Sequence, residues 1–181
     1  GHLAILIRLM KAGASIHALT KDGWAPVHFA CENGHFGILT RLMKKGASIH
    51  VLTKTGLAPI HIASENGDLK ILNSLINAGA RVDVQDSDEW CPIHFACQNG
   101  HLAILIRLMK AGASIHALTK DGRAPIYIAC ANGHLKVVEA LFNAYEDVNA
   151  KINDGRVLIS LAQANGQSLM VDKLIELGAG I

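Results

Sequence analysis

Residues 22–35, DGWAPVHFACENGH, contain a pattern that returns along the whole chain at intervals of 33 residues. A fixed period of this size is typical of stacked supersecondary units, so the sequence predicts a repeat solenoid. The recurring positions are Gly23, Pro26, Ala30 and Gly34; Gly56, Pro59, Ala63 and Gly67; Pro92, Ala96 and Gly100; Gly122, Pro125, Ala129 and Gly133; and, in a weaker copy, Gly155, Ala162 and Gly166.

The period divides the chain into units. In a solenoid each unit contacts only its neighbours, so we expect a single domain over residues 1–181. Gly1 and His2 match the middle of a unit, which favours a fragment of a longer protein. The predicted divisions are a partial repeat at 1–19, full repeats at 20–52, 53–85, 86–118 and 119–151, and a last, incomplete repeat at 152–181 that resembles a C-terminal cap.

The sequence of each unit predicts a turn and two short helices. The turn at 21–23 leads into a first helix with Pro26 in its first turn, where the missing N–H is harmless. Asn33 and Gly34 end this helix, and a second helix runs from His35 to Gly46 with Ile38, Leu39, Leu42 and Met43 facing inward. The fold class is therefore an all-α repeat solenoid.

Composition and charge exclude several classes of partner. Half of the residues are hydrophobic, and the formal net charge of +2 lacks the concentrated basic field of a nucleic-acid binder. The longest apolar run, Leu3 to Ile7, is stopped by Arg8, so no segment approaches a membrane span. The sequence predicts neither a nucleic-acid nor a membrane partner.

The four cysteines, Cys31, Cys91, Cys97 and Cys130, follow no disulfide framework. Three of them occupy the same position in different units, where small apolar residues are wanted. We therefore predict buried, reduced thiols, which favour an intracellular, cytoplasmic location.

Candidate chemistry is sparse. The pairs His28–Cys31 and His94–Cys97 are spaced one helical turn apart and could begin a zinc site, but no unit supplies a second close pair. There is no G-x-S-x-G elbow and no phosphate-binding loop, and the acidic residues are spread along the array. A repeated unit places the same group at every step, so it builds a surface. We predict no catalytic residue, no metal and no cofactor.

The unit GWAPVHFACENGH, followed by RLMKKGASIH at 41–50, resembles the ankyrin repeat, whose motif is close to D-x-x-G-x-T-P-L-H-x-A-A-x-x-G-H. The resemblance covers essentially the whole chain. It implies helix-turn-helix units joined by β-hairpin-like loops in a curved stack, and protein–protein recognition through the hairpin tips and a concave groove. It also implies that His28, His61 and His94 bond backbone groups at the turn.

Departures from the motif are specific. The threonine before proline is replaced in every unit, which costs each first helix up to about 1 kcal/mol of N-capping. Glu89 replaces a turn glycine of the motif, and Tyr145 replaces a glycine at the end of a helix. The last unit lacks the proline and gains Ser160 and Gln163, as a terminal cap requires. The residues at the threonine position are Ala25, Ala58, Cys91, Ala124 and Val157.

The position after the turn glycine changes most in character between units. The resemblance implies that it points toward the groove and varies with the partner. Trp and Arg dominate binding hot spots, so we predict partner contact there. The alternative is that each tryptophan folds back on its own unit as local packing. The residues at this position are Trp24, Leu57, Trp90, Arg123 and Arg156.

Polar residues beside this position are predicted to form the rim of the binding surface. On the hairpin tips they are Lys21, Asp22, Lys54, Asp88, Lys120 and Asp121, and on the first helices they are Glu32, Glu65 and Gln98. Because Arg123 and Arg156 lie toward the C-terminal end, the side chains along the groove are predicted to change from aromatic and acidic at the N-terminal side to basic at the C-terminal side.

Residues 1–23 are identical to residues 100–122, which indicates recent duplication, gene conversion or deliberate construction. Leu3, Ile5 and Leu6 lack a covering helix, and burying each is worth about 1.5–3 kcal/mol. We therefore expect either frayed residues 1–12 or end-to-end self-association. Two further functions remain open: a regulatory or spacer segment of a larger enzyme, channel or secreted effector, and an engineered or assembly-forming array.

Asn149, in the context of Leu141, Asp147 and Val148, is similar to the acceptor of the asparaginyl hydroxylase that modifies ankyrin repeats. In a eukaryotic cell or host we predict hydroxylation of this side chain. Mass spectrometry of the natural protein should find one added oxygen on the peptide that contains Asn149, and its absence would exclude the modification.

Overall fold

The computed structural model describes residues 8, 12–144 and 158–178, and these contain helices and loops but no strand. Each unit contributes a helix of seven residues and a helix of nine. The helices are α2 (Pro26–Glu32), α3 (Phe36–Lys44), α4 (Pro59–Glu65), α5 (Leu69–Asn77), α6 (Pro92–Gln98), α7 (Leu102–Lys110), α8 (Pro125–Ala131), α9 (Leu135–Asn143), α10 (Leu158–Ala164) and α11 (Ser168–Glu176).

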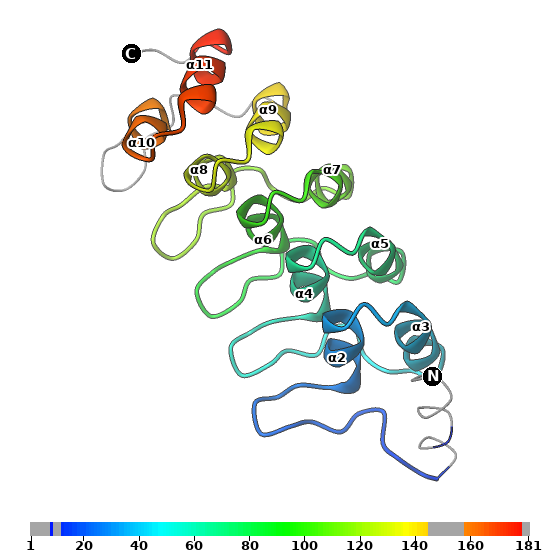
Figure 1. The fold of residues 1–181 in the computed structure, drawn as a ribbon. Coiled ribbons are helices and arrows are strands. Elements are labelled where there is room, and N and C mark those ends of the chain that lie inside the picture. The colour runs from blue at the N-terminus through cyan, green and yellow to red at the C-terminus, as the bar shows by residue number, and fades with distance from the viewer. Residues whose placement is uncertain (1–7, 9–11, 145–157, 179–181) are drawn as a thin grey trace.

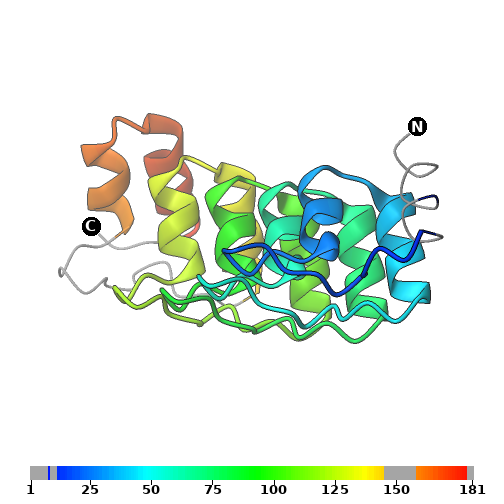
Figure 2. The same ribbon diagram turned by 90° about the horizontal axis from the view of Figure 1, so that it is seen from below.

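The helices form two rows (Figure 1). The first row contains α2, α4, α6, α8 and α10, and the second contains α3, α5, α7, α9 and α11. The loops between one pair and the next project from the side of the first row and lie beside one another along one edge of the molecule (Figures 1 and 2). The prediction of an all-α solenoid of paired helices is confirmed.

Backbone geometry explains where the helices end. Asn33 caps α2, and Gly34 and Gly46 adopt positive φ angles of 64° and 88°, which an L side chain resists. The second helix starts at Phe36, one residue later than predicted, with His35 as its N-cap. The helix boundaries therefore follow the glycines and prolines of the repeat.

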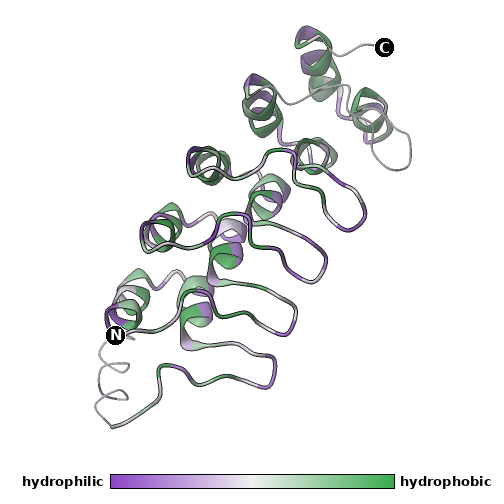
Figure 3. Cartoon of the chain, turned by 180° about the vertical axis from the view of Figure 1, so that it is seen from behind, coloured by the Kyte–Doolittle hydropathy of each residue, from purple (hydrophilic) through white to green (hydrophobic). Residues whose placement is uncertain are grey.

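The core lies between the two rows and between successive pairs. Leu39 and its counterparts Leu72, Leu105 and Val138 are fully buried, and hydrophobic residues recur along both rows (Figure 3). Ile38 and Met43, which were expected to face inward, are only half-buried. For Ile38 the reason is its place at one end of the described stack, since Ile71 and Ile104 at the same repeat position are buried.

Three buried histidines, one in each of α2, α4 and α6, connect their helix to the loop that leads into the next unit. The side chains of His28, His61 and His94 have no exposed surface. Each Nδ1 accepts the backbone N–H of the residue before the helix, Ala25, Ala58 or Cys91, at 2.9 Å. The resemblance's prediction that these histidines bond backbone groups is confirmed.

The bond at Nδ1 fixes the tautomer of each ring, and Nε2 makes the second bond. Because Nδ1 accepts, Nε2 must carry the proton and donate it. His28 donates to Leu57 O at 3.1 Å, His61 to Val84 O at 2.9 Å, and His94 to Ala117 O at 2.9 Å. All three acceptors belong to the loop that leads into the next unit. The imidazole thus satisfies the N–H of the residue before the helix, whereas Ala25, Ala58 and Cys91 make no side-chain cap bond.

The four cysteines are buried and form no disulfide, as predicted. Burial raises the pKa of the Cys31 thiol to about 12 and the pKa of the Cys91 and Cys130 thiols to about 11. These thiols stay protonated near neutral pH and act as small apolar side chains.

Some predictions concern residues that are not described. They are the fraying or self-association of residues 1–12, of which only residues 8 and 12 are described, and the predictions for residues 145–157, which include Tyr145, Asn149 and Arg156. In the described ranges, no helix combines the length and apolar character needed for a transmembrane span.

The buried histidines predict a pH-dependent stability. Burial lowers the pKa of His28, His61 and His94 below the ordinary value of 6.5, so the unfolded chain binds more protons than the folded one below about pH 6.5. The free energy of unfolding should be greatest above that pH and fall as the pH is lowered through it. Each histidine contributes a slope of at most about 1.4 kcal/mol per pH unit.

Chemical unfolding followed by circular dichroism between pH 7.5 and 5 measures this slope. His94→Gln should make this slope shallower. An identical slope in wild type and His94→Gln would contradict the assignment.

Candidate partner-binding surface

We define the loop surface as residues 19–24, 52–57, 85–90 and 118–123. In each of these segments one side chain holds the turn: Thr20, Thr53, Asp86 or Thr119. Its oxygen accepts the backbone N–H four residues later at 3.1, 3.0, 2.8 and 3.0 Å, respectively. Its own N–H donates to the carbonyl of that same residue. The position after the turn glycine therefore has a fixed backbone in every described unit.

Neighbouring loops also bond to one another. The N–H of Lys54 donates to Asp22 O, that of Ser87 to Thr55 O and that of Lys120 to Asp88 O, each at 2.9 Å. These bonds run across the edge where the loops lie side by side (Figure 2). The loop surface is therefore a bonded row and not a set of independent flexible tips.

The close approach of the loops explains the turn glycines. Gly56 has φ +81°, and a Cβ built there would lie 2.9 Å from Asp86 Cα. Glu89, at the same repeat position, also has a positive φ of 62°. The structure thus agrees with the sequence analysis that Glu89 stands where the backbone favours glycine.

The two tryptophans lie partly against their own units. The Trp24 ring is 5.1 Å from the Phe29 ring and 5.6 Å from the His28 ring, measured between centroids. Trp90 has the same arrangement, at 5.3 Å from Phe95 and 5.8 Å from His94. Both indoles are half-buried. Local packing therefore accounts for part of their burial and leaves part of each ring open to a partner.

Arginine replaces tryptophan at this position in the fourth full unit. Arg123 is exposed, its Nε lies 2.6 Å from Asp121 Oδ2, and its guanidinium is 5.8 Å from the centre of the Tyr127 ring. Leu57 is half-buried. Arg156 lies outside the described residues. Trp24, Leu57, Trp90 and Arg123 therefore place aromatic, aliphatic and charged side chains at the same position of successive loops.

All the predicted rim residues are exposed. Those on the loop surface are Lys21, Asp22, Lys54, Asp88, Lys120 and Asp121, and those at the ends of first helices are Glu32, Glu65 and Gln98.

Sequence reasoning missed a row of leucines on the same loops. Leu19, Leu52 and Leu118 are 58%, 46% and 52% exposed. They recur at one repeat position, at which the third loop carries Gln85. The signal was present in the sequence, since a leucine on a turn has no helix face to bury.

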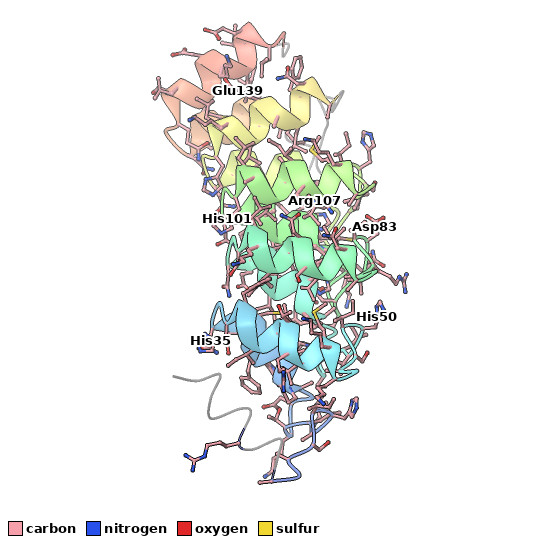
Figure 4. All side chains as sticks on the ribbon, turned by 90° about the vertical axis from the view of Figure 1, so that its right-hand side faces the viewer. His35, His50, Asp83, His101, Arg107 and Glu139 are labelled. Atoms are coloured by element: carbon pink, nitrogen blue, oxygen red, sulfur yellow. The ribbon has the colours of Figure 1, made fainter. Side chains whose placement is uncertain are left out.

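The second-helix side of the stack has a different character (Figure 4). There, Arg107 Nε donates to Asn73 Oδ1 at 2.6 Å, and Ser114 N donates to Asp83 Oδ1 at 3.0 Å. Lys173 Nζ lies 2.9 Å from Glu139 Oε1. Polar side chains of that side thus join one unit to the next.

Within the described part of the chain, no group of three or more His, Cys, Asp or Glu side chains is placed to hold a metal ion. What the described residues assemble is an extended surface of mixed apolar and charged side chains, and such a surface can bind another macromolecule.

A family model described as ankyrin repeats, with three copies, matches residues 1–86, 60–154 and 93–181. A comparison with curated proteins found no match to this sequence.

The loop geometry predicts opposite effects for two matched substitutions. Gly56→Ala adds a Cβ against the Asp86 backbone in a left-handed conformation and should lower the free energy of unfolding by about 2 kcal/mol or more. Glu89→Gly removes a side chain from the left-handed region and should raise it by about 0.5–1 kcal/mol.

Urea unfolding of both variants beside the wild type is the measurement. The same sign of change in both variants would show that backbone conformation does not control these turns.

Proposed function

This chain belongs to the ankyrin repeat family, and on that premise we propose that it binds a partner protein through the loop surface and the exposed ends of the first helices. Ankyrin repeats are generally protein–protein interaction modules, and the family is typically non-enzymatic. The choice of this surface within the chain is our proposal.

The main support for this proposal is that large apolar and aromatic side chains project from loops whose backbones are hydrogen-bonded to one another. Leu19, Leu52 and Leu118 are about half exposed, and Trp24 and Trp90 are half-buried beside them in the same row. Exposed apolar groups that recur on one edge of a protein mark an interaction site.

The bonds between loops support tight binding. A partner meets a row of turns held by backbone bonds such as Lys54 N to Asp22 O. Because these turns are ordered beforehand, little conformational entropy is lost on association.

The charged residues support selectivity. Glu32 and Glu65 lie toward one end of the first row of helices, whereas Arg123 lies toward the other. A partner with the complementary arrangement would be oriented along the row, since charges at the rim select partner and register. Asp121 beside Arg123 moderates the basic end.

Substitution of the tryptophans tests the proposal. Trp24→Ala and Trp90→Ala should each weaken binding of the natural partner by around 2 kcal/mol, because each removes an aromatic anchor from the row. The partner is obtained by affinity capture with the wild type against the Trp24/Trp90 double variant, and the dissociation constants are then measured by calorimetry.

Leu169→Ala on α11 is the matched control, since Leu169 is 76% exposed and far from the loop surface. Circular dichroism checks that each variant remains folded. Unchanged affinity in both tryptophan variants would refute the proposal.

A further inference from the structure

A small cavity of about 140 Å³ lies between the unit 20–52 and the unit 53–85. We call it the joint cavity. Its floor is apolar and buried, and includes Ile49, Ile60 and Ala80. Its rim is exposed, and includes His50, Leu52 and Arg81. All of these residues belong to two complete, neighbouring units of the stack.

The joint cavity has room for one apolar side chain. A cavity of roughly 150 Å³ that is lined by aliphatic side chains binds a group of the size of benzene. The joint cavity is of similar volume and its floor is aliphatic. A valine, leucine or isoleucine side chain of a partner therefore matches its size and its lining.

Arg81 distinguishes this joint from the others. The other described units have serine at the same repeat position, namely Ser15, Ser48 and Ser114. Arg81 is exposed, and in the described part of the chain its guanidinium makes neither an ion pair nor a hydrogen bond. Its positive charge is therefore available to an anion that comes from outside the chain.

The next joint shows how a carboxylate is held at this point of the repeat. There Asp83 occupies the position of His50, and its Oδ1 accepts the backbone N–H of Ser114 at 3.0 Å. Ser114 is the counterpart of Arg81. Figure 4 shows His50 and Asp83 along the same edge of the stack. The chain itself thus supplies a carboxylate at the equivalent place.

At the joint cavity that carboxylate is missing, because the residue is His50. Among the described residues, the backbone N–H of Arg81 has no hydrogen-bond acceptor. A carboxylate placed there as Asp83 is placed in the next joint would accept this N–H and would lie between two cationic side chains, His50 and Arg81. Hydrogen bonds between charged groups are roughly twice as strong as those between neutral groups.

We propose that the joint cavity binds the C-terminal residue of a partner protein, with its apolar side chain in the cavity and its α-carboxylate at the Arg81 N–H. A C-terminal residue carries both groups on one carbon atom, which suits a small apolar cavity with a cationic rim. The rest of the partner leaves over Leu52, which is 46% exposed and belongs to the loop surface. This anchor rests on the proposed function and adds the chemical class of one of its contacts.

The probe is the peptide acetyl-Gly-Ser-Gly-Leu with a free carboxyl group, titrated into the isotope-labelled full chain and followed by NMR. We expect saturable shifts in residues 49–52, 58–60 and 80–84 and none in α11. The same peptide with a C-terminal amide should bind about tenfold more weakly or less well still, because it lacks the charge. Equal affinity for the acid and the amide would overturn the proposal.

Arg81→Ser should weaken binding of the free-acid peptide about tenfold or more, because it removes a charged donor. This variant should stay folded, since neighbouring units have Ser48 and Ser114 at the same position. Arg41→Gln is the matched control, because Arg41 is also an exposed arginine but does not line the cavity. An equal effect of the two substitutions would contradict the assignment of Arg81.

His50→Asp should make this joint resemble the next one. The new carboxylate should accept the Arg81 N–H as Asp83 accepts that of Ser114, and should therefore exclude the peptide and raise the midpoint of urea unfolding. Peptide binding to His50→Asp with the affinity of the wild type would overturn the placement of the carboxylate.

Two further results would overturn the proposal. One is the absence of saturable shifts up to the solubility limit of the peptide. The other is that isocaproic acid binds as tightly as the peptide, since a free carboxylic acid would then be the ligand. The titration uses no natural partner, so its failure would leave the tryptophan test of the loop surface standing, and failure of that test would leave the peptide result standing.

Discussion

The described stack depends on buried imidazoles that must remain neutral and hold one tautomer. At each of three first helices, Nδ1 accepts the N–H that precedes the helix and Nε2 donates into the following loop. Protonation of Nδ1 would bring an N–H against another N–H in a buried site. The same ring therefore bonds the backbone at the start of a helix and the backbone of the loop that follows, so it joins the two.

This constraint separates two kinds of repeat position. Where neighbours interlock, as at His61 and Gly56, most units keep the residue, because the ring nitrogen bonds the next loop and a Cβ added to the glycine would collide with it. Where the side chain leaves the loop, as at Trp24 and Arg123, no neighbouring unit restricts it. Variation in chemistry on an invariant backbone is what a family of binding surfaces requires.

Most of the fold could be predicted from the sequence, because the glycines and prolines that end and begin helices act locally. The helix pairs, the buried cysteines and the backbone role of His28 were predicted from the repeat or from its resemblance. What could not be predicted depends on three-dimensional contacts. The acceptor of each imidazole lies more than twenty residues away, and how much of Trp24 stays open depends on its rotamer over Phe29. The row of exposed leucines appears only once exposure is known.

We propose that the loops bind the partner while the helices stack. Hydrogen–deuterium exchange of the chain, alone and with its captured partner, tests this most directly, because it reports every backbone segment at once. We expect the partner to slow exchange in residues 19–24, 52–57, 85–90 and 118–123 and to leave α3, α5 and α7 unchanged. Protection concentrated on α3, α5 and α7, with the loops unaffected, would contradict it.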